Sequence, residues 1–250
     1  MANPIVLLDA RVFVGGVDLS GYGNKIELSE EAEVKKITTW RSGGAAENTA
    51  GLRSADLSAE GFWEASDPSK PDDAFWSNRR QLVPWSVAPK SDSDLAAGGL
   101  MYLLGRALRT KQQWMGAVGD VAPWMIDATS AWPLVRGVVA QPSGVARTAT
   151  GTGTIIQLGA VPAGKRIYAN IHVLSVAGTA TPTLTAKIQS AAAVGFASPT
   201  DRLAFAAKTA VGWEALRSDG TAITDQYWRV SWTITGTTPS FLFLVSMGIE

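Results

Sequence analysis

Strict alternation of side-chain type over residues 55–63 restricts this stretch to a β-strand with one buried face. Small or apolar residues hold the odd positions, and polar residues hold positions 56, 58 and 60. Because successive side chains of a strand point to opposite faces, the odd positions share the face that packs. Residues 25–29 and 33–40 are two more expected strands, and the tripeptide Glu30–Ala32 between them is expected to form a tight turn.

A loop is expected over residues 41–54, rich in glycine, alanine, serine and asparagine. At about 14 residues it greatly exceeds the usual hairpin connection of roughly 2–5 residues. A connection of this length in a compact sheet protein is usually either disordered or an arm that something else holds in place. The sequence therefore indicates a projecting segment next to the alternating strand.

Residue counts exclude several kinds of chemistry. Cysteine is absent and histidine occurs once, at His172. No disulfide, thiolate metal site, cysteine nucleophile or pair of histidine ligands can form within one chain, and a Ser-His-Asp triad would need that single histidine. His172 stands between apolar neighbours on an expected strand, which predicts a surface position. We therefore expect no enzyme, no cofactor and no metal site.

Charge argues against a tight grip on nucleic acid. The formal net charge is zero, and neither half of the chain is strongly basic. High-affinity binding to phosphates needs a basic surface. Residues 1–14 lack the basic region of a signal peptide, and no apolar run approaches the ~20 residues of a membrane span, so no membrane insertion is expected.

One short helix is expected after residue 70. Pro71 suits the first turn, Asp72 and Asp73 suit the positive end of the helix dipole, and Arg79 and Arg80 suit the negative end.

The second half contains a series of strand patterns separated by short turns. Six strands are expected at residues 154–161, 165–176, 182–190, 202–209, 226–235 and 240–248. Such a series is typical of an antiparallel sandwich. A turn-rich bridge near Pro142 places a boundary there. The predicted fold is all-β with one short helix, as two domains: residues 1–142, and residues 143–250 as a jelly-roll or immunoglobulin-like sandwich.

The first half resembles a known family. Residues 12–40 (VFVGGVDLSGYGNKIELSEEAEVKKITTW) and 42–63 (SGGAAENTAGLRSADLSAEGFW) resemble the opening of the tail tube, or major tail, proteins of long-tailed bacteriophages. The order is a "gvdlSg" hairpin, a strand pair, a small-residue arm and a strand of pattern G-L-x-x-x-x-L-x-x-x-G-F, matched here by Gly51, Leu52, Leu57, Gly61 and Phe62. GAVGDVAPW and PLVRG, at residues 116–124 and 133–137, are similar to later strands, and residues 143–250 resemble sandwich domains appended to phage structural proteins.

This resemblance implies a tail-tube-type β-sandwich or barrel, and a structural virion protein that polymerises into stacked rings, the conduit for DNA ejection. Rings are expected to contain six copies, with three as the alternative, and residues 143–250 to decorate the outside. Implied partners are other copies, the tape measure and terminator proteins, and double-stranded DNA in transient, non-specific passage. The implied location is the virion tail, assembled in the host cytoplasm.

The resemblance also implies roles for two residue sets. The inter-subunit arm would comprise Arg41, Ser42, Gly43, Gly44, Glu47, Asn48, Gly51, Leu52 and Arg53. Acidic residues facing the lumen would include at least one of Glu27, Glu30, Glu31 and Glu33, since carboxylates repel the phosphates of passing DNA.

A binding module is the alternative hypothesis. Residues 143–250 could bind carbohydrate or coat a capsid or cell surface, with Trp213 and Tyr227 as exposed rings that stack on a sugar.

Overall fold

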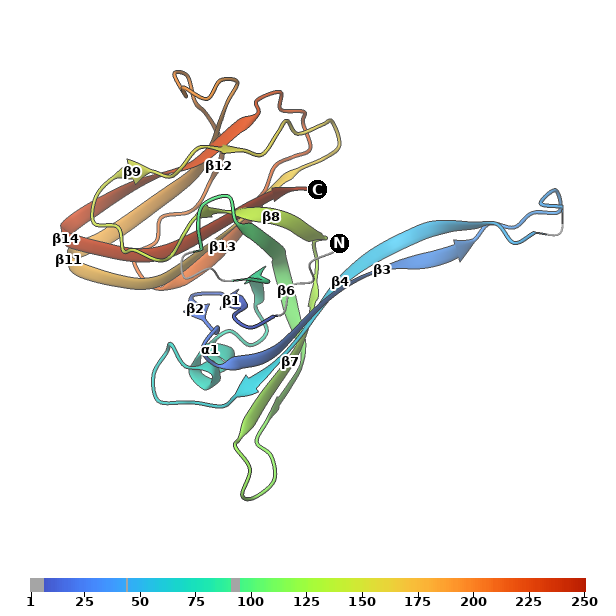
Figure 1. Cartoon of the computed structure of the whole chain (residues 1–250), viewed down its shortest axis with the longest axis horizontal. Coiled ribbons are helices and arrows are strands. Elements are labelled where there is room, and N and C mark those ends of the chain that lie inside the picture. Colours follow the sequence, from blue (N-terminus) through green and yellow to red (C-terminus); the bar gives the residue numbers. More distant parts are fainter. Residues whose placement is uncertain (1–6, 44, 91–94) are drawn as a thin grey trace.

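The computed structural model describes residues 7–43, 45–90 and 95–250, and in them the regular structure is β apart from one short helix. In chain order the elements are β1 (Arg11–Val14), β2 (Val17–Asp18), β3 (Gly23–Lys36), β4 (Asn48–Phe62), α1 (Pro71–Ser77), β5 (Leu82–Ala88), β6 (Leu100–Trp114), β7 (Pro123–Ser130), β8 (Leu134–Gln141), β9 (Gly151–Thr152), β10 (Ile156–Gln157), β11 (Ile167–Ala191), β12 (Thr200–Ala204), β13 (Gly212–Arg217) and β14 (Tyr227–Ile249). The all-β prediction is confirmed. Figure 1 shows a body from which two hairpins project, β3–β4 and β6–β7.

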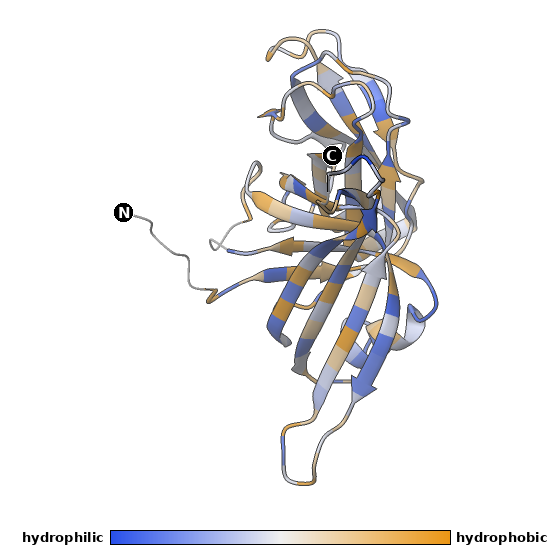
Figure 2. Cartoon of the chain, turned by 90° about the vertical axis from the view of Figure 1, so that its right-hand side faces the viewer, coloured by the Kyte–Doolittle hydropathy of each residue, from blue (hydrophilic) through white to orange (hydrophobic). Residues whose placement is uncertain are grey.

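Alternation over residues 55–63 is confirmed in β4. Ala55, Leu57 and Ala59 are buried, while the polar residues between them are half-buried. The buried face packs into a core made from β1, β2, β4–β7 and α1. Figure 2 shows the resulting bands of hydrophilic and hydrophobic residues along the strands.

Two predictions for the segment before β4 are wrong. β3 runs without interruption through Glu30–Ala32, where a turn was expected, and β4 begins at Asn48, inside the expected loop. The two strands pair from Gly23 with Gly61 to Lys36 with Asn48. The connection is therefore only residues 37–47, at the end of a long hairpin.

Helix α1 forms where it was expected. Pro71 occupies its first turn, and Asp72 and Asp73 follow it at the positive end of the helix. The prediction for the other end is wrong, since α1 stops at Ser77 and no basic residue lies in its last turn. Arg79 instead stacks on the ring of Trp76, at 4.0 Å from the guanidinium carbon to the ring centroid.

In the second half, four of the expected strands merge into two. Residues 165–176 and 182–190 belong to β11, and residues 226–235 and 240–248 belong to β14. Both strands bend sharply, at Gly178 (φ 122°) and Gly236 (φ 117°), in a backbone region that L-side chains rarely adopt. The bends bring the two ends of β11 and β14 around one core, with Trp228, Phe241 and Ile171 among its members. A sheet that turns such a corner forms both layers of a sandwich.

The two halves share a sheet. β8 pairs with β14 (Gly137 opposite Gly248) and with β6, so hydrogen bonds run across the predicted boundary at residue 142. A small core, including Phe13, Met101 and Leu244, joins both sides. The division into two domains stays a prediction.

His172 is fully buried, so the predicted surface position is wrong. The first part of β11 is covered on both faces, because β2, β5 and β6 of the first half, with Phe13 of β1, pack on the side opposite the sandwich core. Among the described residues, no helix is long and apolar enough to cross a membrane.

Candidate assembly interface

The β3–β4 hairpin forms an arm that leaves the body. We use "the arm" for residues 32–53, the part beyond the strand pairing of β4 with β7, which starts at Ala55. Figure 1 shows it reaching far to one side, with no third strand beside it. Every described residue of β3 from Ser29 onward is exposed. An isolated two-stranded hairpin is at best marginally stable in water, so the arm lacks a partner of its own.

Large apolar side chains are exposed along the arm. Val34 is 67% exposed, Leu52 83%, and Trp40 at the tip is 106% exposed. Burying such a side chain completely is worth about 1.5–3 kcal/mol. Local hydrogen bonds shape the tip: the Glu47 N–H donates to the Thr38 hydroxyl at 3.0 Å, and the Thr39 N–H donates to the Ser42 hydroxyl at 2.9 Å.

The predicted arm residues lie in two places. Arg41, Ser42, Gly43 and Glu47 are in the tip, and Asn48, Gly51, Leu52 and Arg53 are in β4. Gly44 lies outside the described residues. At the base of the arm, the Arg53 guanidinium lies 3.9 Å from Glu30 and 3.8 Å from Glu250. Sequence reasoning missed Val34, Ile37 and Trp40, which lay in an expected strand, although Trp40 beside a glycine-rich turn could have been noticed.

Next to the arm lies a four-stranded sheet with two open edges. Its order is β3–β4–β7–β6, where only the second part of β6 takes part. Among the described strands, β3 pairs with β4 alone, and residues 109–114 of β6 pair with β7 alone. About half of the backbone N–H and C=O groups of each edge strand point away from the sheet. Such edges are ready to pair with another chain.

One face of this sheet is acidic. We call it "the acidic face"; it carries Glu27, Glu31 and Glu33 of β3, Asp56 and Glu60 of β4 and Asp127 of β7, with Lys25, Lys35 and Lys111 as its basic residues. The assignment follows from alternation and register, because Ala55, Leu57 and Ala128 point into the core from the other face. A shallow depression lined by Glu27, Ser58 and Asp127 lies on it.

Charges on this face are partly paired. The Lys25 ammonium lies 3.0 Å from Glu60 and 3.3 Å from Glu27, and hydrogen bonds to these two carboxylates raise the pKa of Lys25. Carboxylates outnumber the lysines, so the face is negative at neutral pH. Of the four predicted lumen residues, Glu27, Glu31 and Glu33 share this face, whereas Glu30 points to the opposite one with Ile26 and Leu28. Asp56, Glu60 and Asp127 were missed, because only the register of the strands brings them beside β3.

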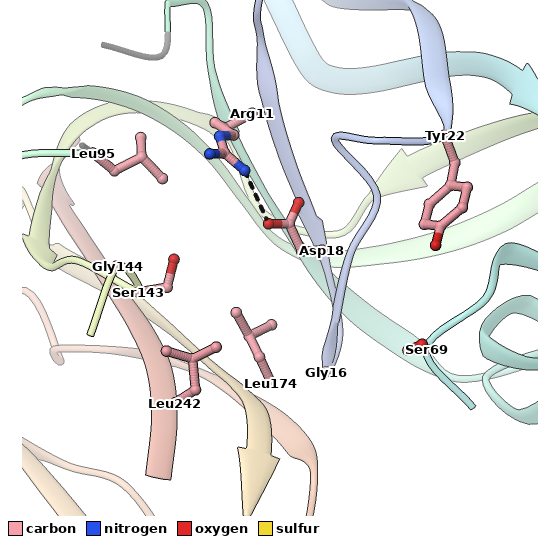
Figure 3. A pocket seen from close by; sticks show the side chains of 10 residues that line it. All are labelled: Arg11, Gly16, Asp18, Tyr22, Ser69, Leu95, Ser143, Gly144, Leu174 and Leu242. Atoms are coloured by element: carbon pink, nitrogen blue, oxygen red, sulfur yellow. Dashed lines mark hydrogen bonds and ion pairs between the residues drawn. The ribbon is translucent and has the colours of Figure 1, made fainter. Parts of the chain in front are cut away.

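A separate cleft of about 280 Å³ lies where the two halves meet. Figure 3 shows Arg11 and Asp18 from the first half and Leu174 and Leu242 from the second half around it. The Arg11 guanidinium and the Asp18 carboxylate are 3.4 Å apart and satisfy each other. Its remaining lining is largely uncharged, so the cleft offers no concentrated chemistry.

No family model and no curated protein matches the chain. Several solved structures match in part. A protein from the virion of a native gene transfer agent particle is 20% identical, over 51% of this chain and 95% of that one, with a TM-score of 0.39. A protein from the sheath-tube complex of an extracellular contractile injection system (PVC, extended state) is 12% identical, over 54% and 93%, with a TM-score of 0.43.

The Dit (gp 19.1) protein of SPP1, described as a paradigm of hub adsorption apparatus in phages that infect Gram-positive hosts, matches over both halves. It is 12% identical, over 96% of this chain and 99% of that one, with a TM-score of 0.35. All three TM-scores lie below 0.5. Their descriptions name a virion, a sheath-tube complex and a hub adsorption apparatus.

Proposed function

We propose that this chain is a structural subunit of a phage-type tail, which joins copies of itself into rings that stack into a tube for the passage of DNA. The arm is the observation that carries the proposal. It projects from the body as a bare hairpin with exposed Val34, Trp40 and Leu52, and these side chains leave water only on contact with another molecule.

Open edges support head-to-tail association. The β3 edge and the β6 edge lie on opposite sides of one sheet, so β3 of one copy can pair with β6 of the next. A contact between two different surfaces generates a closed ring when the rotation closes. Closure removes both edges and forms a continuous barrel from the sheets of all copies. Six copies per ring follow from the sequence resemblance, with three as the alternative.

The acidic face is the proposed lumen surface. A conduit for DNA has to avoid holding its cargo, and carboxylates such as Glu27 and Glu31 repel phosphates. Under this arrangement Glu30 does not line the lumen. Tape measure and terminator proteins are the further partners expected for such a tube, and the virion tail is its expected location.

The carbohydrate-binding alternative finds less support. Trp213 is half-buried and packs against the core of the first half, so it is not an exposed stacking ring. Tyr227 is also only partly exposed.

Shortening the arm tests the proposal. Replacement of residues 32–53 by Asn-Gly joins the paired residues Glu31 and Ser54 through a two-residue turn that suits a hairpin. We expect a folded monomer with a β-type circular dichroism spectrum and cooperative unfolding that forms no rings by negative-stain microscopy, whereas the full chain forms rings. Rings from the shortened chain, or a full chain that stays monomeric at every concentration, would contradict the proposal. Val194→Ala, an exposed apolar substitution in the second half, is the control and should assemble normally.

A further inference from the structure

An aromatic groove with acidic walls lies beside α1. It has a volume of about 590 Å³ and is lined by Trp63, Asp72, Asp73, Trp76, Trp114 and Met115. Its walls come from three places: the end of β4, helix α1 and the end of β6. We call it "the α1 groove".

Two large apolar side chains that line the α1 groove are unusually exposed to solvent. Trp76 is 55% exposed and Met115 is 64% exposed. The rings of Trp76 and Trp114 are 6.3 Å apart, and the indole N–H of Trp114 is buried without a hydrogen-bond partner among the described residues. An open cluster of large apolar side chains of this kind marks a contact site for another molecule.

Carboxylates give the α1 groove a preference for cations. Asp72 accepts one hydrogen bond from the Trp63 indole at 3.1 Å, and Asp73 accepts one from the Ser66 N–H at 3.1 Å. Each carboxylate keeps further acceptor positions. One face of the Trp76 ring is covered by the Arg79 guanidinium, at 4.0 Å from the guanidinium carbon to the ring centroid, which leaves the other face for a neighbour.

The arm tip has the complementary chemistry. Residues 36–47 carry one acidic side chain, Glu47, and two basic side chains, Lys36 and Arg41, which gives this segment a net charge of +1. Both are exposed, and they flank Ile37, 50% exposed, and the fully exposed Trp40. The aromatic ring of the tip can pack against the indoles of the groove, and the neighbouring guanidinium can pair with its carboxylates.

The tip and the groove of one copy cannot meet. Figure 1 places the arm tip at one end of the long axis and α1 beside the opposite end of the β3–β4 hairpin, in the body. We propose that the arm tip of one copy docks in the α1 groove of the next copy, with Trp40 against Trp76 and Trp114. Arg41 and Lys36 then face Asp72 and Asp73. This inference rests on the proposed ring assembly and names the surface that receives the arm.

Introduced cysteines test the contact directly, because the chain has none of its own. Thr39→Cys lies in the tip and Met115→Cys in the groove wall. When assembled protein is oxidised, we expect the double variant to give a ladder of covalent multimers on a non-reducing gel. Each single variant can give dimers at most. A double variant that assembles normally yet stops at dimers would overturn the docking site.

Charge reversal provides a second, independent test. Arg41→Asp and Asp73→Arg should each raise the concentration needed for assembly about tenfold, equivalent to ~1.4 kcal/mol. The combined variant should recover most of this loss, because the pair is restored in reverse. Arg136→Asp, a reversal at an exposed position of β8, is the control and should have no effect.

Failure here is distinct from failure of ring assembly. If shortening the arm abolishes rings but Asp73→Arg and Trp76→Ala assemble like the unmodified chain, the arm binds elsewhere and the groove assignment is wrong. In that case another occupant of the α1 groove, such as a different tail protein or a small cationic ligand, is indicated. If shortening the arm changes nothing, ring assembly through the arm is itself wrong.

Discussion

The Ser86 hydroxyl donates a hydrogen bond of 2.8 Å to Nε2 of His172, and both residues are fully buried between the two halves of the chain. Nδ1 of His172 lies 2.6 Å from the Gly15 carbonyl oxygen. A carbonyl only accepts, so Nδ1 carries the proton and Nε2 is the acceptor. The Ser86 oxygen in turn accepts from the Ser246 hydroxyl at 2.9 Å and from the Asn170 amide at 3.3 Å. These groups satisfy one another's hydrogen bonds away from solvent, so the network joins the two halves of the chain.

Burial of His172 predicts a loss of stability in mild acid. Desolvation lowers the pKa of His172 from its ordinary value of 6.5 to about 4. Between these two pH values His172 is protonated in the unfolded chain and neutral in the folded chain. Its contribution to the free energy of unfolding therefore falls as the pH drops from about 6.5 towards 4, and it is constant below pH 4. We expect a loss of about 2 kcal/mol between pH 7 and pH 5, measured by urea denaturation.

A matched variant isolates this effect, since His172 is the only histidine in the chain. His172→Gln should be less stable at pH 7 but should show a flatter dependence between pH 7 and pH 5. An unchanged slope in this variant would assign the acid sensitivity to other groups.

The corner glycines of β11 and β14 should tolerate no side chain. A Cβ on Gly178 would lie 2.8 Å from the Thr238 carbonyl oxygen, and one on Gly236 would lie 2.9 Å from Pro182 Cα. Backbone crowding adds to the strain of the positive φ, so alanine at either site should lower stability by about 1–3 kcal/mol or more. Thermal unfolding measures this. Gly144→Ala, with open space around its Cβ and no positive φ, is the control, and an equal loss there would contradict the argument.

Lysines on the acidic face should make assembled protein retain DNA. The double variant Glu27→Lys with Glu31→Lys reverses two charges on the proposed lumen surface, and we expect salt-sensitive retention of double-stranded DNA in a gel-shift assay of rings. Glu27→Lys alone and Glu30→Lys form the matched comparison, because each is a single glutamate-to-lysine change on β3 and the two side chains point to opposite faces. Equal retention by both variants would show that the acidic face is not the lumen.

Sequence patterns correctly predicted the elements that have one solvent-exposed face and one buried face. The alternation of Ala55, Leu57 and Ala59 predicted β4 correctly, and Pro71 with two acidic residues predicted α1. Both patterns work because burial selects residue type at a fixed period.

The same reasoning failed where that premise does not hold. Both faces of the arm are exposed to solvent, so apolar and polar residues do not alternate in Glu30–Ala32 and residues 48–54. These segments were therefore predicted to be a turn and part of a loop. The first part of β11 is buried on both faces. The position of His172 between apolar residues therefore did not indicate whether its side chain is exposed to solvent. The acidic face and the α1 groove depend on which strands become neighbours, which no local pattern contains.

Pairing of β8 with β14 has a mechanical consequence. The two halves are connected by antiparallel backbone hydrogen bonds and a common apolar cluster, and a swivel between them would have to break several bonds at about 1 kcal/mol each. If the chain forms a tube, a torque applied to the first half would therefore rotate residues 167–250 together with it as one rigid unit.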